Sequence, residues 1–318
     1  FCTLLRVFFF FYLLSVFGEV QLKMASIIDG KAIAATIRSE IASHVKELRE
    51  AHPEAPAPGL CAVIVGTRKD SETYVRLKQK AAEECGFVNI PAALPEDTTQ
   101  EALIAKVQEL NANPACHGII VQLPLPKHIN EHEVILAIDP AKDADCLHPL
   151  NVGLMALRGP APTVLPCTPA GVIQLLKRSN ITMEGQRAVV LGRSNIVGMP
   201  VSILLQKENA TVTMVHSQSK NIDAIVKEAD IVVSAMGRPE MVPAAWLKPG
   251  ATVIDVSTTP VDDATKKAGF RLAGDVCFED ACKVAGHITP VPGGVGPMTI
   301  AMLLQNTLRS YEKLAVKK

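Results

Sequence analysis

The sequence is poor in aromatic side chains and has no excess of charge of either sign. Aromatic residues make up 4% of the 318 residues, and 32 basic side chains balance 32 acidic ones. A neutral chain creates no long-range field that attracts nucleic acid or an anionic membrane. We therefore predict no nucleic-acid partner, and no stable membrane association for residues 24–318. The length and the aliphatic content suit two domains with large cores.

Paired cysteine motifs are also missing. The eight cysteines include no CxxC pair, and no histidine follows them at the spacing of a zinc site. We therefore predict no metal site. We interpret the cysteines as reduced thiols and predict a cytoplasmic protein.

The first 23 residues differ in composition from the rest of the chain. Residues 1–17 are almost wholly apolar, and their length lies at the lower limit for crossing a bilayer, about 17 residues. Three interpretations remain open: a translated stretch ahead of a start at Met24, a targeting segment that directs the protein to an organelle, or a membrane anchor. We exclude residues 1–23 from the fold prediction.

From Met24 onward, strand-like and helix-like patterns alternate, which is typical of an α/β fold with parallel sheets. Asp70 or Ser71 can cap one of the first helices. The first half of the chain predicts helices over 31–51, 71–85 and 99–111, and strands over 60–66, 87–94 and 117–126. Together these form one βαβαβ unit.

Residues 139–169 contain several prolines and little periodicity, so we predict a connection between domains there. A helix can then start at Thr168, with Pro169 at its first position. The second series predicts strands over 186–192, 211–215, 230–237 and 251–257, and helices over 198–208 and 221–228. A final helix, near Met298–Leu314, can return to the first domain.

The predicted fold is therefore α/β with two domains. An N-terminal catalytic domain covers residues 24–168 and is joined by the C-terminal helix, residues 297–318. A Rossmann-like nucleotide-binding domain covers residues 169–296.

Four polar side chains of the first domain are candidates for chemistry. Tyr74 and Lys78 lie four residues apart on one helical face, and burial would let the lysine exchange protons. Such pairs are also common on solvated helices. Gln122 follows a buried strand, where open α/β sheets bind ligands, although it can equally be a satisfied strand-end amide. Asp143 and Asp145 lie in a loop where a turn-forming role is the ordinary interpretation.

Residues 189–200 place a glycine turn between a strand and a helix, where backbone donors favour phosphate. The glycines are Gly192 and Gly198, which departs from the GxGxxG pattern, but Arg193 and Ser194 add a cation and a hydroxyl. The next strand ends in His216 and Ser217, without the carboxylate usual for NAD. We therefore predict NADP as the cofactor, with a simple helix-capping loop as the alternative.

Residues 290–299 contain three glycines and three prolines just before the last helix. Such a loop can let a flat ligand approach the backbone, although a tight structural turn explains it equally well.

In order, these segments resemble the bifunctional methylenetetrahydrofolate dehydrogenase/methenyltetrahydrofolate cyclohydrolase family, the FolD type. The resemblance runs from about Ser26 to Tyr311. Its motifs are SETYVRLKQKAAEECG, VQLPLP, PAKDADCLHPLNVG, GRSNIVGMP and PVPGGVGPMT.

The resemblance implies a fold of two α/β domains that flank a cleft, and a homodimer formed through the cofactor domain. It implies that Lys78 is the catalytic lysine, Tyr74 stacks beside the folate ring, Gln122 orients Lys78, and Asp145 binds the pterin. The implied substrate-binding residues are Tyr74, Lys78, Val121, Gln122, Leu123, Asp145, Pro292, Gly293, Gly294, Val295 and Gly296. For the cofactor, it implies Gly192, Arg193 and Ser194 at the phosphates, Ser217 near the 2'-phosphate and Thr258 near the nicotinamide half.

Two positions depart from the family pattern. Cys146 replaces the glycine after the folate aspartate, and Ser257 replaces the last residue of the usual DVG. An added Cβ is costly where a glycine adopts positive φ. These departures affect the local backbone geometry and remove no catalytic group.

The resulting hypothesis is an enzyme that oxidises 5,10-methylenetetrahydrofolate with NADP and hydrolyses the methenyl product to 10-formyltetrahydrofolate. Lys78 would transfer the protons of the second step. The alternatives are a dehydrogenase without cyclohydrolase activity, a non-catalytic NADP-binding regulatory protein, and an unrelated Rossmann oxidoreductase.

Overall fold

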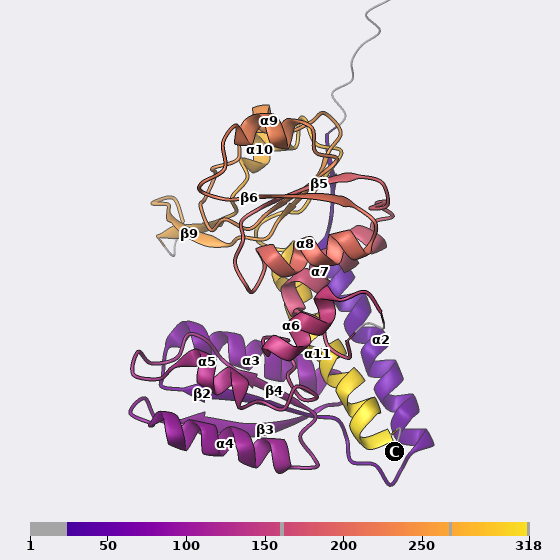
Figure 1. The fold of residues 1–318 in the computed structure, drawn as a ribbon, viewed down its shortest axis with the longest axis vertical. Helices are drawn as coiled ribbons and strands as arrows, with labels where there is room; N and C mark the ends of the chain where they lie inside the picture. The colour runs from indigo at the N-terminus through magenta and orange to yellow at the C-terminus, as the bar shows by residue number, and fades with distance from the viewer. Residues whose placement is uncertain (1–23, 160–161, 267–268, 317–318) are drawn as a thin grey trace, which may run out of the picture.

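A computed structural model describes residues 24–159, 162–266 and 269–316 of the chain. The three interpretations of residues 1–23 fall outside this part. The described chain forms two lobes, each built on its own parallel sheet, with the smaller sheet in the lower lobe of Figure 1.

The smaller sheet has the strand order β3-β2-β4, with β2 Gly59–Val65, β3 Val88–Leu94 and β4 Gly118–Val121. Helices α3 (Lys69–Glu84) and α4 (Gln100–Ala112) lie on its two faces (Figure 1). Leu60 and Ala62 of β2 contact the α3 side, while Cys61 and Val63 contact the α4 side. A strand that is buried on both faces has a continuous apolar sequence, and this is why a strand could be predicted over residues 60–66.

The larger sheet has the parallel order β1-β11-β8-β7-β5-β6. Its strands are β1 Ser26–Ile27, β5 Arg187–Leu191, β6 Thr211–Val215, β7 Ile231–Ser234, β8 Thr252–Asp255 and β11 His287–Ile288. The helices of this lobe include α8 Gly198–Lys207, α9 Ile222–Lys227 and α10 Phe278–Ala281. The predicted strands and helices of the second series are confirmed within a few residues.

Three helices connect the lobes: α2 (Gly30–Ala51), α7 (Cys167–Arg178) and α11 (Val295–Tyr311). One hydrophobic cluster runs from the smaller sheet through these helices to the larger sheet. It contains Leu60 below, Leu175 and Leu304 in the middle, and Val190 above. The returning C-terminal helix is thus confirmed, and both sheets pack against one shared core.

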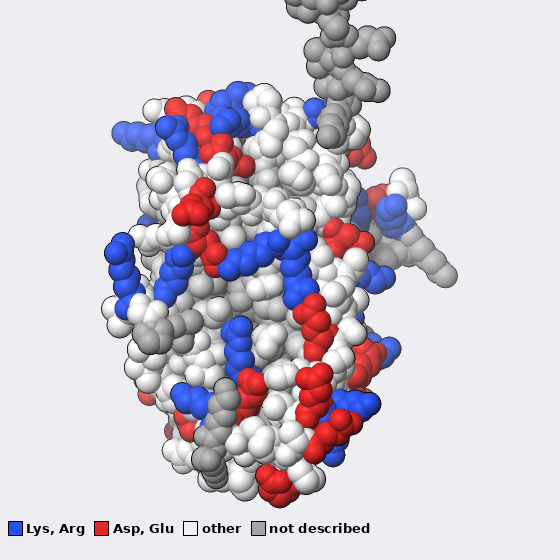
Figure 2. Space-filling view, turned by 90° about the vertical axis from the view of Figure 1, so that its right-hand side faces the viewer, with Lys and Arg blue, Asp and Glu red and all other residues white. Residues whose placement is uncertain are grey.

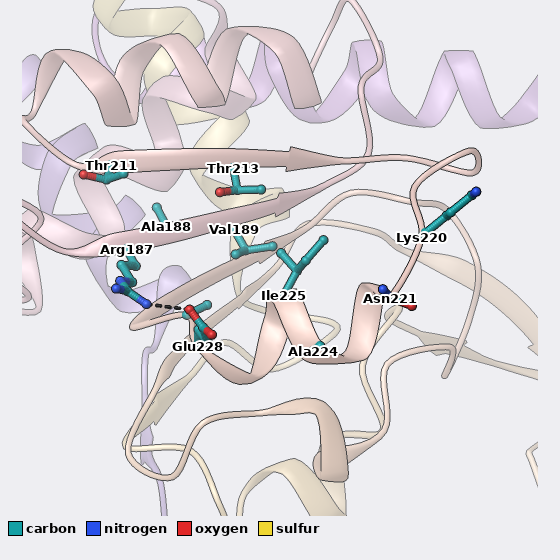
Figure 3. A pocket seen from close by; sticks show the side chains of 11 residues that line it. Arg187, Ala188, Val189, Thr211, Thr213, Lys220, Asn221, Ala224, Ile225 and Glu228 are labelled. Carbon is teal, nitrogen blue, oxygen red and sulfur yellow. Dashed lines mark hydrogen bonds and ion pairs between the residues drawn. The ribbon is translucent and has the colours of Figure 1, made fainter.

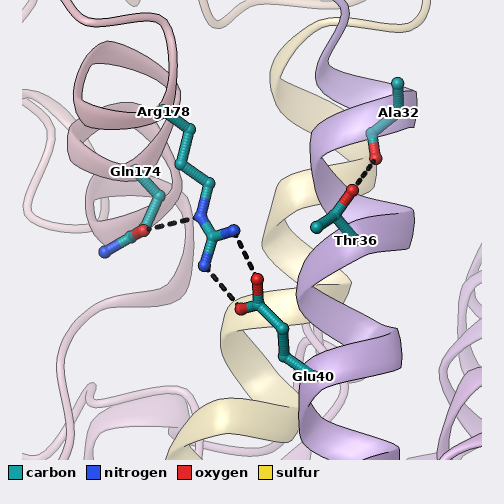
Figure 4. Close-up of polar contacts among 5 residues, drawn as sticks. All are labelled: Ala32, Thr36, Glu40, Gln174 and Arg178. Atoms are coloured by element: carbon teal, nitrogen blue, oxygen red, sulfur yellow. Dashed lines mark hydrogen bonds and ion pairs between the residues drawn. The ribbon is translucent and has the colours of Figure 1, made fainter.

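An ion pair ties α2 to α7 at the edge of this core (Figure 4). The Arg178 guanidinium donates to both carboxylate oxygens of Glu40, at 2.7 and 2.6 Å. This pairing lowers the pKa of Glu40 and raises that of Arg178. Both side chains are partly exposed, so the pair contributes at most about 1 kcal/mol.

Several elements differ from the prediction. The connection at 139–169 contains a helix, α6 (Pro149–Ala156), and a second short helix, α5 (Glu131–Leu136), precedes it. Helix α3 begins at Lys69 after Arg68, with no side-chain cap, so capping by Asp70 or Ser71 is wrong. Helix α7 begins at Cys167, which makes Pro169 its third residue rather than its first.

Two strand features carry no periodic signal in the sequence. β1 is two residues long and pairs with β11, so the chain enters the larger sheet before it builds the smaller one. β9 (Thr259–Asp262) and β10 (Phe270–Ala273) form an antiparallel hairpin. Strands this short give too few alternations to be recognised from sequence.

Basic and acidic side chains are interspersed on the face shown in Figure 2, as the neutral composition predicts. Within the described part of the chain, no helix combines the length and apolarity needed to cross a membrane.

His117 is a buried titratable group at the contact between the smaller sheet and α11. Its Nδ1 accepts the Gly59 N–H at 3.0 Å, and its ring meets that of Tyr311 edge-on at 5.0 Å. Burial, aided by the positive charge of Lys142, lowers the pKa of His117 from 6.5 to about 4.

Stability should therefore fall as the solution is acidified, because the unfolded chain takes up this proton near pH 6.5 and the folded chain only near pH 4. Between pH 7 and pH 5, His117 should account for a loss of about 2 kcal/mol in the free energy of unfolding. His117→Gln keeps an acceptor for Gly59 without titrating, so urea unfolding at the two pH values should show a smaller loss. Equal losses in the two proteins would contradict this assignment.

Candidate active site

Helix α3 presents Tyr74 and Lys78 one turn apart, with different environments. The Lys78 side chain is 9% exposed, while that of Tyr74 is 56% exposed. The Lys78 Nζ donates to Gln122 Oε1 at 3.1 Å. A buried ammonium needs an acceptor, so this contact decides where the lysine points.

Gln122 is held in place by the end of the smaller sheet. Its backbone N–H donates to Val63 O at 2.9 Å, which extends the pairing of β4 with β2 by one residue. Its Nε2 donates to Leu123 O at 2.8 Å. With its donor side used in this way, the amide presents its oxygen to Lys78.

Asp145 comes to the same edge because the chain before it runs beside β4. Asp143 forms a parallel bridge with Ile119, and the Ala144 N–H donates to Ile119 O at 3.2 Å. Because this segment runs parallel to β4, its next residue, Asp145, lies at the carboxyl end of β4, where Gln122 also lies. The Asp145 side chain is half-buried there.

Cys167, at the start of α7, links this group together. Its Sγ lies 3.8 Å from Asp145 Oδ1 and donates to Ala144 O at 3.3 Å. Burial raises the pKa of the thiol, the negative charge of Asp145 raises it further, and the positive charge of Lys78 lowers it. The structure thus brings Lys78, Gln122, Asp145 and Cys167 together. Sequence reasoning missed Cys167, whose only signal is its place at a helix start.

Asp143 has a structural role here. It is 1% exposed and accepts the N–H groups of Leu147 and His148, at 3.2 and 2.9 Å, and the Asn151 amide at 3.0 Å. Burial raises its pKa, against the lowering effect of these donors. It therefore organises the chain that leads into α6.

The predicted phosphate loop lies between β5 and α8. A Cβ at Gly192, where φ is +120°, would fall 2.3 Å from Ala235 O, and a Cβ at Gly198 would fall 2.4 Å from Gly192 O. Only glycine fits at either position. Arg193 and Ser194 are exposed, and Ser194 Oγ accepts the N–H groups of Val197 and Gly198 at 3.2 and 3.3 Å.

The remaining cofactor candidates lie at the same edge of the larger sheet. Ser217 is exposed just after β6, whose Val215 pairs with Leu191 of β5. Thr258 is exposed just after β8. The loop after a parallel strand lies at the carboxyl edge of the sheet, so these residues line the edge where α/β folds bind dinucleotides.

The glycine-rich loop before α11 lies against the start of α2. A Cβ at Gly30 would fall 1.8 Å from Gly294 O. Gly294 and Val295 are buried, whereas Pro292 and Gly296 are exposed. Pro292 lines a cavity of about 660 Å³ together with Asp255. Among the described residues, no hydrogen bond joins this loop to Lys78 or Gln122.

The two departures from the glycine pattern have different consequences. Cys146 adopts φ +58°, the left-handed region that glycine occupies freely. Its thiol is buried and donates to Val164 O at 3.6 Å. Ser257 is absent from the positive-φ residues of the described chain, so its Cβ brings no such strain.

The fold and the site define a two-domain α/β enzyme with a nucleotide-binding lobe and a buried lysine–amide pair in the other lobe. The chain belongs to the tetrahydrofolate dehydrogenase/cyclohydrolase family, whose catalytic-domain model matches residues 28–145 and whose NAD(P)-binding-domain model matches residues 166–315.

Known relatives cover nearly the whole chain. Bifunctional protein FolD 2 of Arabidopsis thaliana is 60% identical over 290 residues, 91% of this chain and 96% of that protein. Bifunctional protein FolD 4, chloroplastic, of the same plant is 52% identical, over 91% of this chain and 80% of that protein. The crystal structure of Trypanosoma brucei methylenetetrahydrofolate dehydrogenase-cyclohydrolase (FolD), complexed with NADP cofactor and inhibitor, is 51% identical. It has a TM-score of 0.87 and covers 91% of this chain and 98% of that one.

These findings confirm the predicted family, fold class and cofactor. The chain is an oxidoreductase and a hydrolase that uses NADP and acts on tetrahydrofolate derivatives, so the bifunctional hypothesis is preferred over its three alternatives.

The different roles of Asp143 and Asp145 can be tested by unfolding in urea. Asp143→Ala leaves buried N–H groups without an acceptor and should lower the free energy of unfolding by about 3 kcal/mol. Asp145→Ala, at a half-buried neighbour, should lower it by less than about 1 kcal/mol. A similar loss in both variants would contradict the structural role of Asp143.

Proposed function

We propose that Lys78 is the catalytic group of the hydrolytic step, with Gln122 as its orienting partner and Asp145 and Tyr74 as substrate-binding residues. The observation that supports this most is the 3.1 Å contact between the buried Lys78 Nζ and Gln122 Oε1. A fixed ammonium group can exchange protons with a bound ligand in one geometry.

For the oxidation, NADP would, when bound, supply the hydride acceptor for the carbon between the two folate nitrogens, whose lone pairs stabilise the cation that forms. This step needs no general base. The contribution of the chain is to hold the two reactants in position, with the exposed Tyr74 ring as a surface on which the flat pterin can stack.

In the hydrolysis, a water oxygen bonds to the methenyl carbon and loses a proton. The resulting hydroxyl loses its remaining proton as the carbonyl forms, the bond from that carbon to N5 breaks, and N5 takes up a proton. The water oxygen thus loses two protons and N5 gains one, so the step releases one proton overall. We propose that Lys78 carries these protons and that its contact with Gln122 keeps the nitrogen in place between transfers.

For the cofactor, we propose that Gly192, Arg193 and Ser194 hold the phosphates and Ser217 the 2'-phosphate, with Thr258 near the nicotinamide half. The fit of the phosphates is supported by Gly192 and Gly198, where an added Cβ would clash with the backbone. It is also supported by the N-terminus of α8, whose Gly198 N–H donates to Ser194 Oγ. The substrate-binding role of Val121, Leu123 and residues 292–296 rests on the family resemblance and stays a prediction.

Replacing Lys78 by Met should abolish release of 10-formyltetrahydrofolate while NADP binding is unchanged, because methionine fills the space but carries no proton. Lys80→Met is the matched control, since Lys80 is on the same helix and its side chain is 73% exposed. Hydrolysis is measured from the decay of methenyltetrahydrofolate absorbance. A Lys78→Met protein with normal turnover would refute the catalytic role.

We also propose a homodimer formed through the cofactor lobe. Among the residues that the structure describes, β6 is an edge strand that pairs with β5 alone, and an unpaired edge is prone to associate. Beside it, an open groove of about 610 Å³ lies between the sheet and α9, lined by Thr211, Thr213 and Ile225 (Figure 3). A second copy of the chain can cover both features.

Light scattering should then give twice the 34.0 kDa mass of the chain. Thr213→Arg places a charge in the groove and should shift the protein toward the monomer. Thr36→Arg, at an exposed threonine of α2, is the control and should leave the measured mass at that of the dimer. A monomeric unmodified protein would overturn the dimer.

We propose that residues 24–168 with 297–318 act as the folate lobe and residues 169–296 as the cofactor lobe, with β1 contributed to the cofactor sheet. We keep the cytoplasm as the proposed compartment, because the seven cysteines of the described chain are free thiols. An organelle is the alternative if residues 1–23 act as a targeting segment.

A further inference from the structure

The hydroxyl of Ser257 joins two loops at the carboxyl edge of the larger sheet. β7 and β8 are parallel neighbours, with Ser234 opposite Asp255, and one loop follows each strand. Ser257, in the loop after β8, accepts the N–H of Gly237 at 3.0 Å, in the loop after β7. The same hydroxyl donates to Asp275 Oδ2 at 2.7 Å.

Asp275 holds the rest of the β7 loop. It is fully buried and accepts the N–H groups of Met236 and Arg238, both at 2.7 Å. The N–H groups of residues 236, 237 and 238 are therefore all engaged, the outer two by Asp275 and the middle one by Ser257. Successive N–H groups of this kind can surround an anionic group, and here they surround the Asp275 carboxylate and the Ser257 hydroxyl.

Ser257 itself is fixed from its own strand. Its N–H donates to Asp255 Oδ1 at 3.3 Å, and Asp255 also accepts the N–H groups of Asp275 and Val276, at 3.0 and 2.8 Å. A Cβ at Gly274 would fall 2.1 Å from Asp255 Oδ2, so only glycine at position 274 leaves space for this carboxyl group. Burial raises the pKa of Asp255 to about 7.

The loop that Ser257 holds borders the phosphate loop directly. A Cβ at Gly192 would fall 2.3 Å from Ala235 O, the first residue after β7. The strands follow the order β6, β5, β7, β8 along the sheet. A dinucleotide with its 2'-phosphate end over β6 and its phosphates over β5 extends its other half toward the loops after β7 and β8.

We propose that Ser257 is a positioning residue for hydride transfer, which fixes residues 236–238 for the nicotinamide half of NADP. The proposal rests on the proposed function, since it assumes the cofactor orientation given there. A glycine at position 257 would leave the Gly237 N–H without this acceptor. The loop would then adopt other conformations, and cofactor binding would have to restore the productive one.

Three consequences distinguish this role from a general effect on folding. Hydrolysis of methenyltetrahydrofolate does not use the nicotinamide, so the loss of the hydroxyl should affect oxidation alone. The 2'-phosphate lies at the other end of the cofactor, so NADP and NAD should be weakened by the same factor. Threonine keeps a hydroxyl on the same Cβ and should preserve binding.

The experiment compares Ser257→Gly, Ser257→Ala and Ser257→Thr in the full chain. We expect KM for NADP and the dissociation constant of NADPH to rise roughly fivefold in the first two, the usual effect of one lost hydrogen bond. Cofactor-free cyclohydrolase turnover should stay at the unmodified level in all three, and Ser257→Thr should match the unmodified protein throughout.

Unchanged cofactor affinity in Ser257→Ala would overturn the proposal, as would an equal loss of both activities or a loss confined to NADP. NADPH binding is titrated without folate, so it tests the Ser257 role even if Lys78→Met keeps full hydrolysis and the proposed catalytic role fails.

Discussion

The arrangement of the candidate active site depends on one buried ammonium group. Lys78 is 9% exposed, and removing a positive charge from water is costly unless a fixed acceptor replaces the solvent. Gln122 is that acceptor, and its amide can turn only one way because its Nε2 is held by Leu123 O. Gln122, which directly follows the four-residue strand β4, thus sets the position of the Lys78 side chain on α3, 44 residues earlier in the chain.

That geometry requires the smaller sheet and α3 to keep their relative position, which the shared core provides. Val75 and Ala82 of α3 pack in the same cluster as Ile120 of β4 and Leu304 of α11. Since this cluster continues into the larger sheet, the lobe that holds the lysine and the lobe that binds the cofactor have one common support. A cavity in that core would therefore disturb both reactions.

The sequence predicted what depends on local periodicity and on types of side chain. Buried parallel strands appear as apolar runs, and the Tyr74–Lys78 spacing and the strand-end Gln122 could be read directly. The two-residue strand β1, the helix α6 and the contact of Cys167 with Asp145 could not be predicted, because each depends on long-range packing. The sequence marked Cys146 and Ser257 only as departures from a glycine pattern.

Cys146 and Ser257 show that the effect of a side chain at a usual glycine position depends on the backbone conformation there. At Cys146 the backbone keeps φ +58°, which costs a non-glycine residue roughly 1–2 kcal/mol, and the buried thiol offsets part of this cost. At Ser257 the backbone has no positive φ, and the new side chain gains two hydrogen bonds. At position 146 the residue therefore combines backbone strain with a buried thiol contact to Val164 O. The serine at position 257 adds an acceptor beside the proposed nicotinamide site, where a glycine would leave a backbone N–H dependent on solvent.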